Sequence, residues 1–170
     1  MSLWDRQTKL SRHVPTVPGW EQEAAERARW HDDRGRDVYF GVCLRREGLS
    51  HYGRGKKRDL VAIPGFWMDI DIAGPGHAAK NLPPTVLGAL GLLTVAPTIT
   101  VHSGGGLHLY WLFEGGCMPL ASPSDVRHYE EHLKALQGEI IAAGWARGWH
   151  VDATHDLTRV LRVPGTSNHK

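Results

Sequence analysis

The sequence predicts a mixed α/β fold of the α+β kind, with an antiparallel-rich sheet and helices packed behind it. Four short segments rich in apolar and β-branched residues are typical of strands: 38–42, 66–72, 95–101 and 107–113. The last two are separated by three glycines, which favours a hairpin and antiparallel pairing. Apolar residues at helical spacing between Ser122 and Gly144 predict a long helix beside these strands.

The N-terminal part is expected to be helical. Residues 20–34 are rich in Glu, Ala and Arg and predict a surface helix that ends near Gly35. The first eighteen residues are polar and charged, so we expect no signal peptide. We therefore expect residues 1–37 to be a helical segment packed on the core and residues 38–170 to be the main domain. The length suits a single domain overall, which can be part of a longer protein.

A basic loop, residues 45–59, follows the first predicted strand and is punctuated by glycines. Four of its cationic residues stand close together: Arg54, Lys56, Lys57 and Arg58. A charge run of this kind is usually a solvated hairpin tip. Because the loop leads directly into residues 60–63 and the next strand, we interpret it as a segment that contacts phosphates of a nucleic acid.

Two carboxylates on one strand are the most informative feature of the chain. Side chains alternate between the two faces of a strand, so Asp69 and Asp71 share a face with Trp67. The opposite face is wholly apolar. The two like charges repel each other, and burying either one without a partner costs several kcal/mol. A divalent cation between them would remove that cost, and Mg²⁺ or Mn²⁺ prefers such oxygen ligands. The alternative is a strand that surfaces at its end, with both carboxylates solvated.

A glycine turn lies between the two later strands. It consists of Ser103, Gly104, Gly105 and Gly106. Glycines permit positive φ values and let a ligand approach the backbone, so the turn amides and the Ser103 hydroxyl can form an anion site. Alternation places His108 opposite the apolar face of its strand, at the mouth of this turn. The turn amides, the Ser103 hydroxyl and His108 together suit the binding of a triphosphate. The alternative is a glycine hairpin with a surface histidine.

The C-terminal part contains further acidic and basic residues. Asp152 and Asp156 are both candidates for a third carboxylate, and Asp152 is preferred because it follows a strand-like apolar stretch. Arg159 and Arg162 are three apart, so a regular strand places them on opposite faces. A turn signal at 164–168 then leads to the end of the chain. The alternative is a loop with a surface ion pair between Asp156 and Arg159, which contributes about 0–1 kcal/mol.

Two helices are predicted between these motifs. Two prolines and Thr85 open a short apolar helix that extends to Leu93. Ser122 is expected to cap the longer helix, and Gly144 to end it. Its apolar stripe consists of Val126, Tyr129, Leu133, Leu136 and Ile140, which we expect to face the core.

The net charge, the cysteines and the apolar stretches limit the kinds of protein that this chain can be. The net charge is +2, so charge alone does not indicate a nucleic-acid-binding protein. Cys43 and Cys117 are isolated, which argues against a structural zinc within this chain and favours a reducing, cytoplasmic compartment. The longest apolar stretches, such as 87–96, are too short to cross a membrane.

Together, three motifs resemble the archaeo-eukaryotic primase superfamily, and more closely its primase-polymerase branch of plasmids, phages and mobile elements. That family has, in order, an hhhDhD strand, an S-G-x-G-x-H turn, and an Asp followed by R-hh-R-h-P-G-T-x-N-x-K. Here the motifs lie around Asp69 and Asp71, at 103–108, and from Asp152 through 159–170. The resemblance covers residues 38–170. It implies an RNA-recognition-like antiparallel-rich sheet joined to a second small αβ unit.

The resemblance implies a template-dependent nucleotidyltransferase: a DNA primase or polymerase that works by a two-metal mechanism in replication or repair. Asp69, Asp71 and Asp152 would hold two Mg²⁺ or Mn²⁺ ions and act in catalysis. The implied nucleotide-binding residues are Ser103, Gly104, Gly105, Gly106, His108, Arg159, Arg162, Asn168 and Lys170. The implied partners are a single-stranded DNA template and primer, nucleoside triphosphates, and a helicase domain or protein.

Two other functions use part of the same pattern. A metal-dependent nuclease or phosphodiesterase could use the carboxylates with His108 as general acid, but it has no use for a phosphate-binding glycine turn. A non-catalytic module that binds single-stranded nucleic acid would need neither carboxylate. Dependence on a nucleoside triphosphate would distinguish a polymerase from a nuclease. Metal-independent binding of nucleic acid, unaffected by loss of Asp69 or Asp71, would indicate the non-catalytic module.

Overall fold

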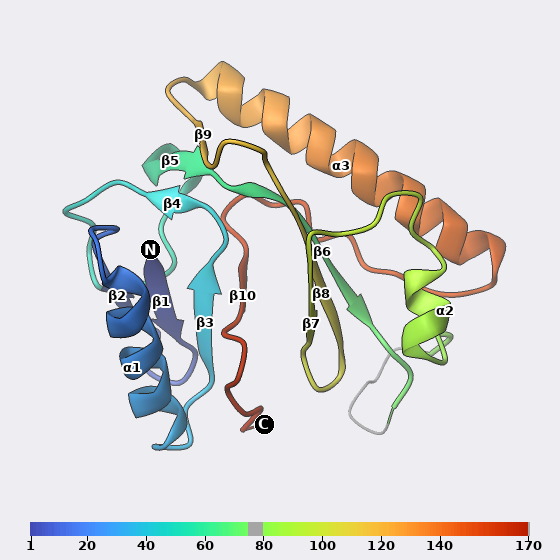
Figure 1. Cartoon of the computed structure of the whole chain (residues 1–170), viewed down its shortest axis with the longest axis horizontal. Helices are drawn as coiled ribbons and strands as arrows, with labels where there is room; N and C mark the ends of the chain where they lie inside the picture. The colour runs from blue at the N-terminus through green and yellow to red at the C-terminus, as the bar shows by residue number, and fades with distance from the viewer. Residues whose placement is uncertain (75–79, 170) are drawn as a thin grey trace. The chain divides into compact units, whose positions relative to one another are not determined.

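A computed structural model describes residues 1–74 and 80–169, so the predicted role of Lys170 lies outside the described residues (Figure 1). The chain is a mixed α+β protein that divides into two compact units. Unit 1 comprises Met1–Pro64, Cys117–Pro123 and the chain from Leu157 onward, and unit 2 comprises Gly65–Gly116 and Ser124–Asp156. Unit 2 is therefore inserted into unit 1 in the sequence. None of the helices in the described ranges combines the length and apolar character needed to span a membrane.

Unit 1 contains a four-stranded antiparallel sheet in the order β10-β3-β1-β2. Its strands are β1 (Ser2–Asp5), β2 (Ser11–His13), β3 (Val38–Gly41) and β10 (Val160–Arg162). Helix α1 (Trp20–Asp32) contributes Ala28 to a small core with Leu3 and Val38. The predicted helix 20–34 and strand 38–42 are thus present. The segment 1–37, expected to be helical, also supplies two strands, because β1 pairs directly with β3.

A second, smaller sheet in unit 1 frames the basic loop. It has the order β4-β5-β9, formed by β4 (Leu44–Arg45), β5 (Leu60–Ile63) and β9 (Met118–Pro119). The short 3₁₀ helix η1 (Lys57–Asp59) ends the loop just before β5. The loop therefore connects two paired antiparallel strands, as a long hairpin does.

Unit 2 is built on a three-stranded antiparallel sheet in the order β6-β8-β7. Its strands are β6 (Gly65–Asp71), β7 (Ile99–His102) and β8 (Gly106–Leu112), with the helices α2 (Val86–Leu90) and α3 (Pro123–Ala146). The predicted apolar faces form the core of this unit: Met68 and Ile70 of β6, and Leu107 and Leu109 of β8, cluster with Ile140 of α3.

The helix ends differ from the predictions for local reasons. The short helix ends earlier than Leu93 and begins after Thr85, whose hydroxyl accepts a hydrogen bond from the Gly88 amide. The long helix continues past Gly144 to Ala146. Gly144 is buried within it, and a Cβ there would lie 2.9 Å from Val151. This glycine allows close packing on the helix and does not end it.

A buried amide links three segments of unit 2. The side chain of Gln137, on α3, donates to the Trp67 carbonyl oxygen at 2.8 Å and accepts from the Thr154 amide at 2.8 Å. The Trp67 indole in turn donates to the Thr154 carbonyl at 3.0 Å. Since β6 is an edge strand, Gln137 satisfies a strand carbonyl that has no neighbouring strand to bond.

We predict that Gln137→Met lowers the free energy of unfolding by about 2–6 kcal/mol. The substitution keeps the side-chain volume but leaves the Trp67 carbonyl and the Thr154 amide without their partner, and each such buried group costs about 1–3 kcal/mol. Urea denaturation followed by fluorescence measures the change. Glu139→Met, at an exposed position of the same helix, is the control. Equal unfolding midpoints for the two variants would contradict the role of this amide.

Candidate active site on the β6–β8 sheet

Pairing of β6 with β8 brings the predicted acidic and histidine residues together. Asp69 is directly opposite His108, and Asp71 is opposite Gly106. Residues opposite each other in an antiparallel pair project to the same face, so both carboxylates and the imidazole share the face away from the apolar core. His108 Nε2 lies 3.7 Å from Asp69 Oδ1. The structure thus brings together Asp69, Asp71 and His108 as predicted from strand alternation.

The environment of this face is drier than the sequence suggests. His108 is only 5% exposed, whereas the alternative interpretation of the turn required a surface histidine. The Asp69 side chain retains 24% exposure. Burial, together with the negative charge of Asp69, raises the pKa of the neighbouring Tyr110 above its ordinary value. Tyr110 therefore stays a neutral phenol at physiological pH and can orient groups but not act as a base.

The glycine turn is held by backbone hydrogen bonds, one within the turn and one from the residue that follows β6. The Ser103 amide donates to the Gly106 carbonyl at 2.9 Å, and the Ile72 amide donates to the Gly105 carbonyl at 2.9 Å. Gly104 has a φ of 92°, which favours glycine. A Cβ on Gly106 would collide with the Ile70 carbonyl and lie 2.9 Å from the Asp71 Cα. Gly106 is therefore required for β8 to approach β6 at the position of Asp71.

The third carboxylate is not gathered with the other two. Asp152 is exposed and accepts a hydrogen bond from His150 Nε2 at 2.9 Å, and Asp156 is also exposed. Within residues 1–74 and 80–169, no group of three or more His, Cys, Asp or Glu side chains is placed to hold a metal ion. The two carboxylates of β6 are the oxygen donors that a hard divalent cation prefers. The choice of Asp152 over Asp156 stays a prediction.

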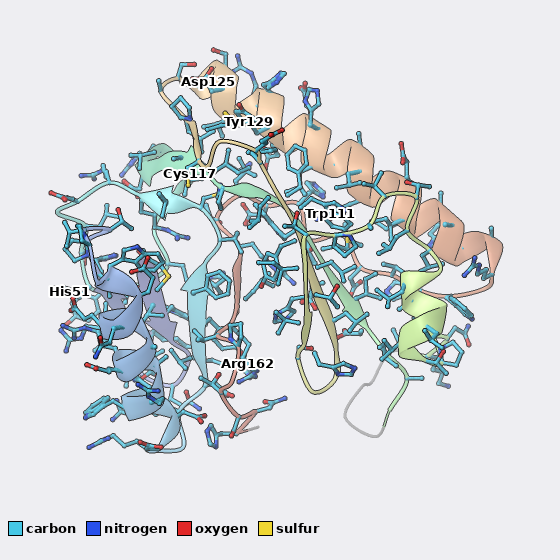
Figure 2. All side chains as sticks on the ribbon, viewed as in Figure 1. His51, Trp111, Cys117, Asp125, Tyr129 and Arg162 are labelled. Carbon is cyan, nitrogen blue, oxygen red and sulfur yellow. The ribbon has the colours of Figure 1, made fainter. Side chains whose placement is uncertain are left out.

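Arg162 and Asn168 lie in unit 1, where Arg162 bonds both to Asn168 and to the buried carboxylate of Asp37. Figure 2 labels Arg162. Arg162 donates to Asp37 Oδ1 at 2.8 Å and to Asn168 Oδ1 at 3.0 Å, and also to Tyr39 and Ser167. Burial acts to raise the pKa of Asp37, but the hydrogen bonds and positive charge of Arg162 outweigh it and hold this pKa below its ordinary value. Arg162 therefore neutralises Asp37, and its nucleotide-binding role stays a prediction, as does that of the half-buried Arg159.

The basic loop is anchored from within while its cations remain exposed. The Asp59 carboxylate accepts from the Lys56 amide at 2.9 Å and from Arg46 Nε at 3.1 Å. The Arg54 guanidinium lies over the Trp4 ring, 5.4 Å from its centre. All four predicted phosphate-contacting residues, Arg54, Lys56, Lys57 and Arg58, are exposed. The loop can therefore present positive charge on a fixed backbone.

Two important residues were missed from the sequence. Gln137 interrupts the apolar stripe of α3 between Leu133 and Ile140, and a lone amide at a core position was the signal that could have identified it. Asp37 gave no local signal, because its partner Arg162 is far away in the sequence.

Comparison with known proteins establishes the fold. No protein-family model matches the chain, and no curated protein matches it in sequence. Among solved structures, the chain is similar to the AEP domain of the cyanophage S-2L primase-polymerase, PrimPol, with a TM-score of 0.54 and 17% sequence identity. The match covers 99% of this chain and 72% of that one. The chain has this fold. The predicted fold class, an archaeo-eukaryotic primase-like α+β fold with antiparallel sheets, is thereby confirmed.

We predict that Gly106→Ala disrupts unit 2, whereas Gly104→Ala costs only about 1 kcal/mol. An alanine at 106 would meet the backbone of β6, which cannot move without breaking its pairing with β8. At Gly104 there is open space, so only the positive φ is strained. Thermal unfolding of both variants measures the difference. Similar losses would mean that the turn, and not the approach of the two strands, requires these glycines.

Proposed function

We propose that this protein is a template-dependent nucleotidyltransferase, a DNA primase or polymerase that joins nucleotides on single-stranded DNA. The observation that carries the proposal is the pairing of the Asp69 and Asp71 strand with the His108 strand, beside a glycine turn. A fold similar to that of an AEP domain in a named primase-polymerase supports the same conclusion. The protein would act in the cytoplasm, in replication or repair of a plasmid, phage or mobile element, with a primer, a template and a helicase as partners.

Asp69 and Asp71 would hold Mg²⁺ or Mn²⁺. Asp152, which the structure does not gather with them, would approach as the third ligand when the ions bind. When bound, two such ions activate the primer hydroxyl and neutralise the charge of the triphosphate. The carboxylates lie two residues apart on a strand buried on its other face, so the sheet fixes their spacing. Preorganised charged groups of this kind need no rearrangement during the reaction.

His108 and the glycine turn would bind the triphosphate of the incoming nucleotide. Because the Ser103 amide already donates to Gly106, Ser103 would contribute its hydroxyl. His108 Nε2 lies 3.7 Å from Asp69 Oδ1, on the face that carries the carboxylates, and an imidazole N–H there can donate a hydrogen bond to a phosphate oxygen. Because His108 is buried, a hydrogen bond that it makes to a phosphate would be stronger than the same bond in water.

We predict that Asp69→Asn and Asp71→Asn each abolish nucleotide incorporation while the protein stays folded. Each variant removes a metal ligand, but it also removes repulsion in the metal-free protein, so stability should be unchanged or slightly higher. Primer extension with labelled nucleotides, in Mg²⁺ and in Mn²⁺, measures activity. Asp33→Asn, at an exposed position of unit 1, is the control. Full activity in either variant would disprove the assignment, and strand cleavage without a nucleoside triphosphate would favour a nuclease.

We predict that His108→Gln raises the KM for nucleotide and lowers kcat, because a contact with the triphosphate acts in both the ground state and the transition state. DNA affinity should change little. Steady-state extension assays and DNA titrations separate these quantities. His102→Gln, at an exposed position of β7, serves as the control. Loss of DNA affinity with an unchanged KM would assign His108 to the template instead.

We predict that replacing Arg54, Lys56, Lys57 and Arg58 together by Gln weakens single-stranded DNA binding and its salt dependence. The slope of log K against log salt falls by about 0.7 for each phosphate that the protein ceases to neutralise, so two such phosphates flatten it by about 1.4. Titrations at several salt concentrations measure the slope. A raised nucleotide KM with an unchanged slope would indicate contact with the triphosphate. If both quantities match the wild type, the loop is a solvated hairpin tip.

A further inference from the structure

The exposed side of α3 carries two histidines one helical turn apart, outside the motifs that form the β6–β8 face. His128 and His132 are both exposed, and their ring centres lie 4.2 Å apart. Residues four apart on a helix share one face, so the backbone itself holds the two imidazoles side by side. Their exposure leaves room for an ion and its water ligands.

The helix also fixes the tautomer of one of these rings. His132 Nδ1 lies 2.7 Å from the carbonyl oxygen of His128. A carbonyl only accepts hydrogen bonds, so Nδ1 carries the proton and the Nε2 of a neutral His132 carries the lone pair. A backbone carbonyl that orients an imidazole in this way is a common outer partner of metal-binding histidines.

Other histidines of the chain are bonded in ways that compete with a metal. Both ring nitrogens of His13 contact oxygen atoms, at Ser2 and Ser50. Ring nitrogens of three more lie next to carboxylates: His31 beside Asp5, His150 beside Asp152, and His169 beside Asp32. The pair on α3 combines proximity, exposure and a defined tautomer.

We propose that His128 and His132 bind one borderline divalent cation, Zn²⁺, Ni²⁺ or Cu²⁺, with water completing its coordination. Imidazole nitrogen suits these ions, whereas the carboxylates of β6 suit Mg²⁺ and Mn²⁺. The adjacent Glu130 and Glu131 add negative charge that attracts a cation. The site differs from the cysteine-ligated structural zinc that the sequence argues against, because no part of the fold depends on it.

The spacing His128-Tyr129-Glu130-Glu131-His132 also matches the His-x-x-Glu-His pattern of one class of zinc peptidases. Such enzymes need a third protein ligand. No such ligand set is present in the described ranges 1–74 and 80–169, and both histidines are exposed on the helix surface. We therefore assign metal binding to the pair and no peptidase activity.

Calorimetric titration of the whole chain with Zn²⁺, Ni²⁺ and Cu²⁺ tests the proposal. With Mg²⁺ in excess to occupy the carboxylates of β6, one ion should bind at the α3 pair, most tightly for Cu²⁺, and Mg²⁺ should not displace it. His128→Gln and His132→Gln should each weaken binding more than about tenfold, since even outer-sphere changes cost 10–100-fold. Circular dichroism checks that both variants keep their helix.

Two controls separate this site from the candidate active site. His102→Gln should bind the ions as the wild type does, and so should Asp69→Asn, whatever its effect on nucleotide incorporation. Unchanged affinity in either α3 variant would place the ion at other histidines and overturn the proposal. Absence of saturable binding by the wild type would overturn it as well, and neither result would affect the proposed polymerase activity.

Discussion

The hydrogen bonds of Gln137 are the interaction on which unit 2 depends most. One buried amide satisfies the open edge of β6 and the backbone of the segment that ends unit 2. Asp69 lies two residues after Trp67, and Asp152 lies two residues before Thr154. The segments that carry two of the predicted metal ligands are therefore each tied to Gln137 within two residues. A polar side chain in the core costs stability unless it is fully bonded, and here both ends of the amide are used.

The parts of the fold with a local pattern were predictable from the sequence. Alternation identified β6 and β8 and assigned their faces correctly, because the period of two depends only on neighbouring residues. The same reasoning placed Asp69, Asp71 and His108 on one face. The burial of His108 was not predictable, since it depends on what covers that face and not on the strand itself.

Features formed by distant residues gave weaker signals. The strand β1 has four residues, and it is a strand because β3 and β2 pair with its two edges. Arg162 shows the same limitation at the level of function. Its motif resembles a nucleotide-binding one, yet in unit 1 its guanidinium bonds to the buried Asp37, where an unpaired carboxylate would be costly. The positive charge of Arg162 could serve either the ion pair with Asp37 or a contact with a nucleotide. The fold shows only the ion pair.

The insertion of unit 2 into unit 1 makes the pairing of β10 with β3 a contact between distant parts of the chain. Strands β1, β2 and β3 are close in the sequence and can pair with one another before β10 joins them. The pairing of β10 comes later, because Val160 pairs with Gly41 and this contact closes a loop of most of the chain. Closing so long a loop slows folding, since its entropy is lost before the contacts form. Until β10 pairs with it, one edge of β3 stays open to pairing with other chains, so Val160–Arg162 protect this edge against aggregation.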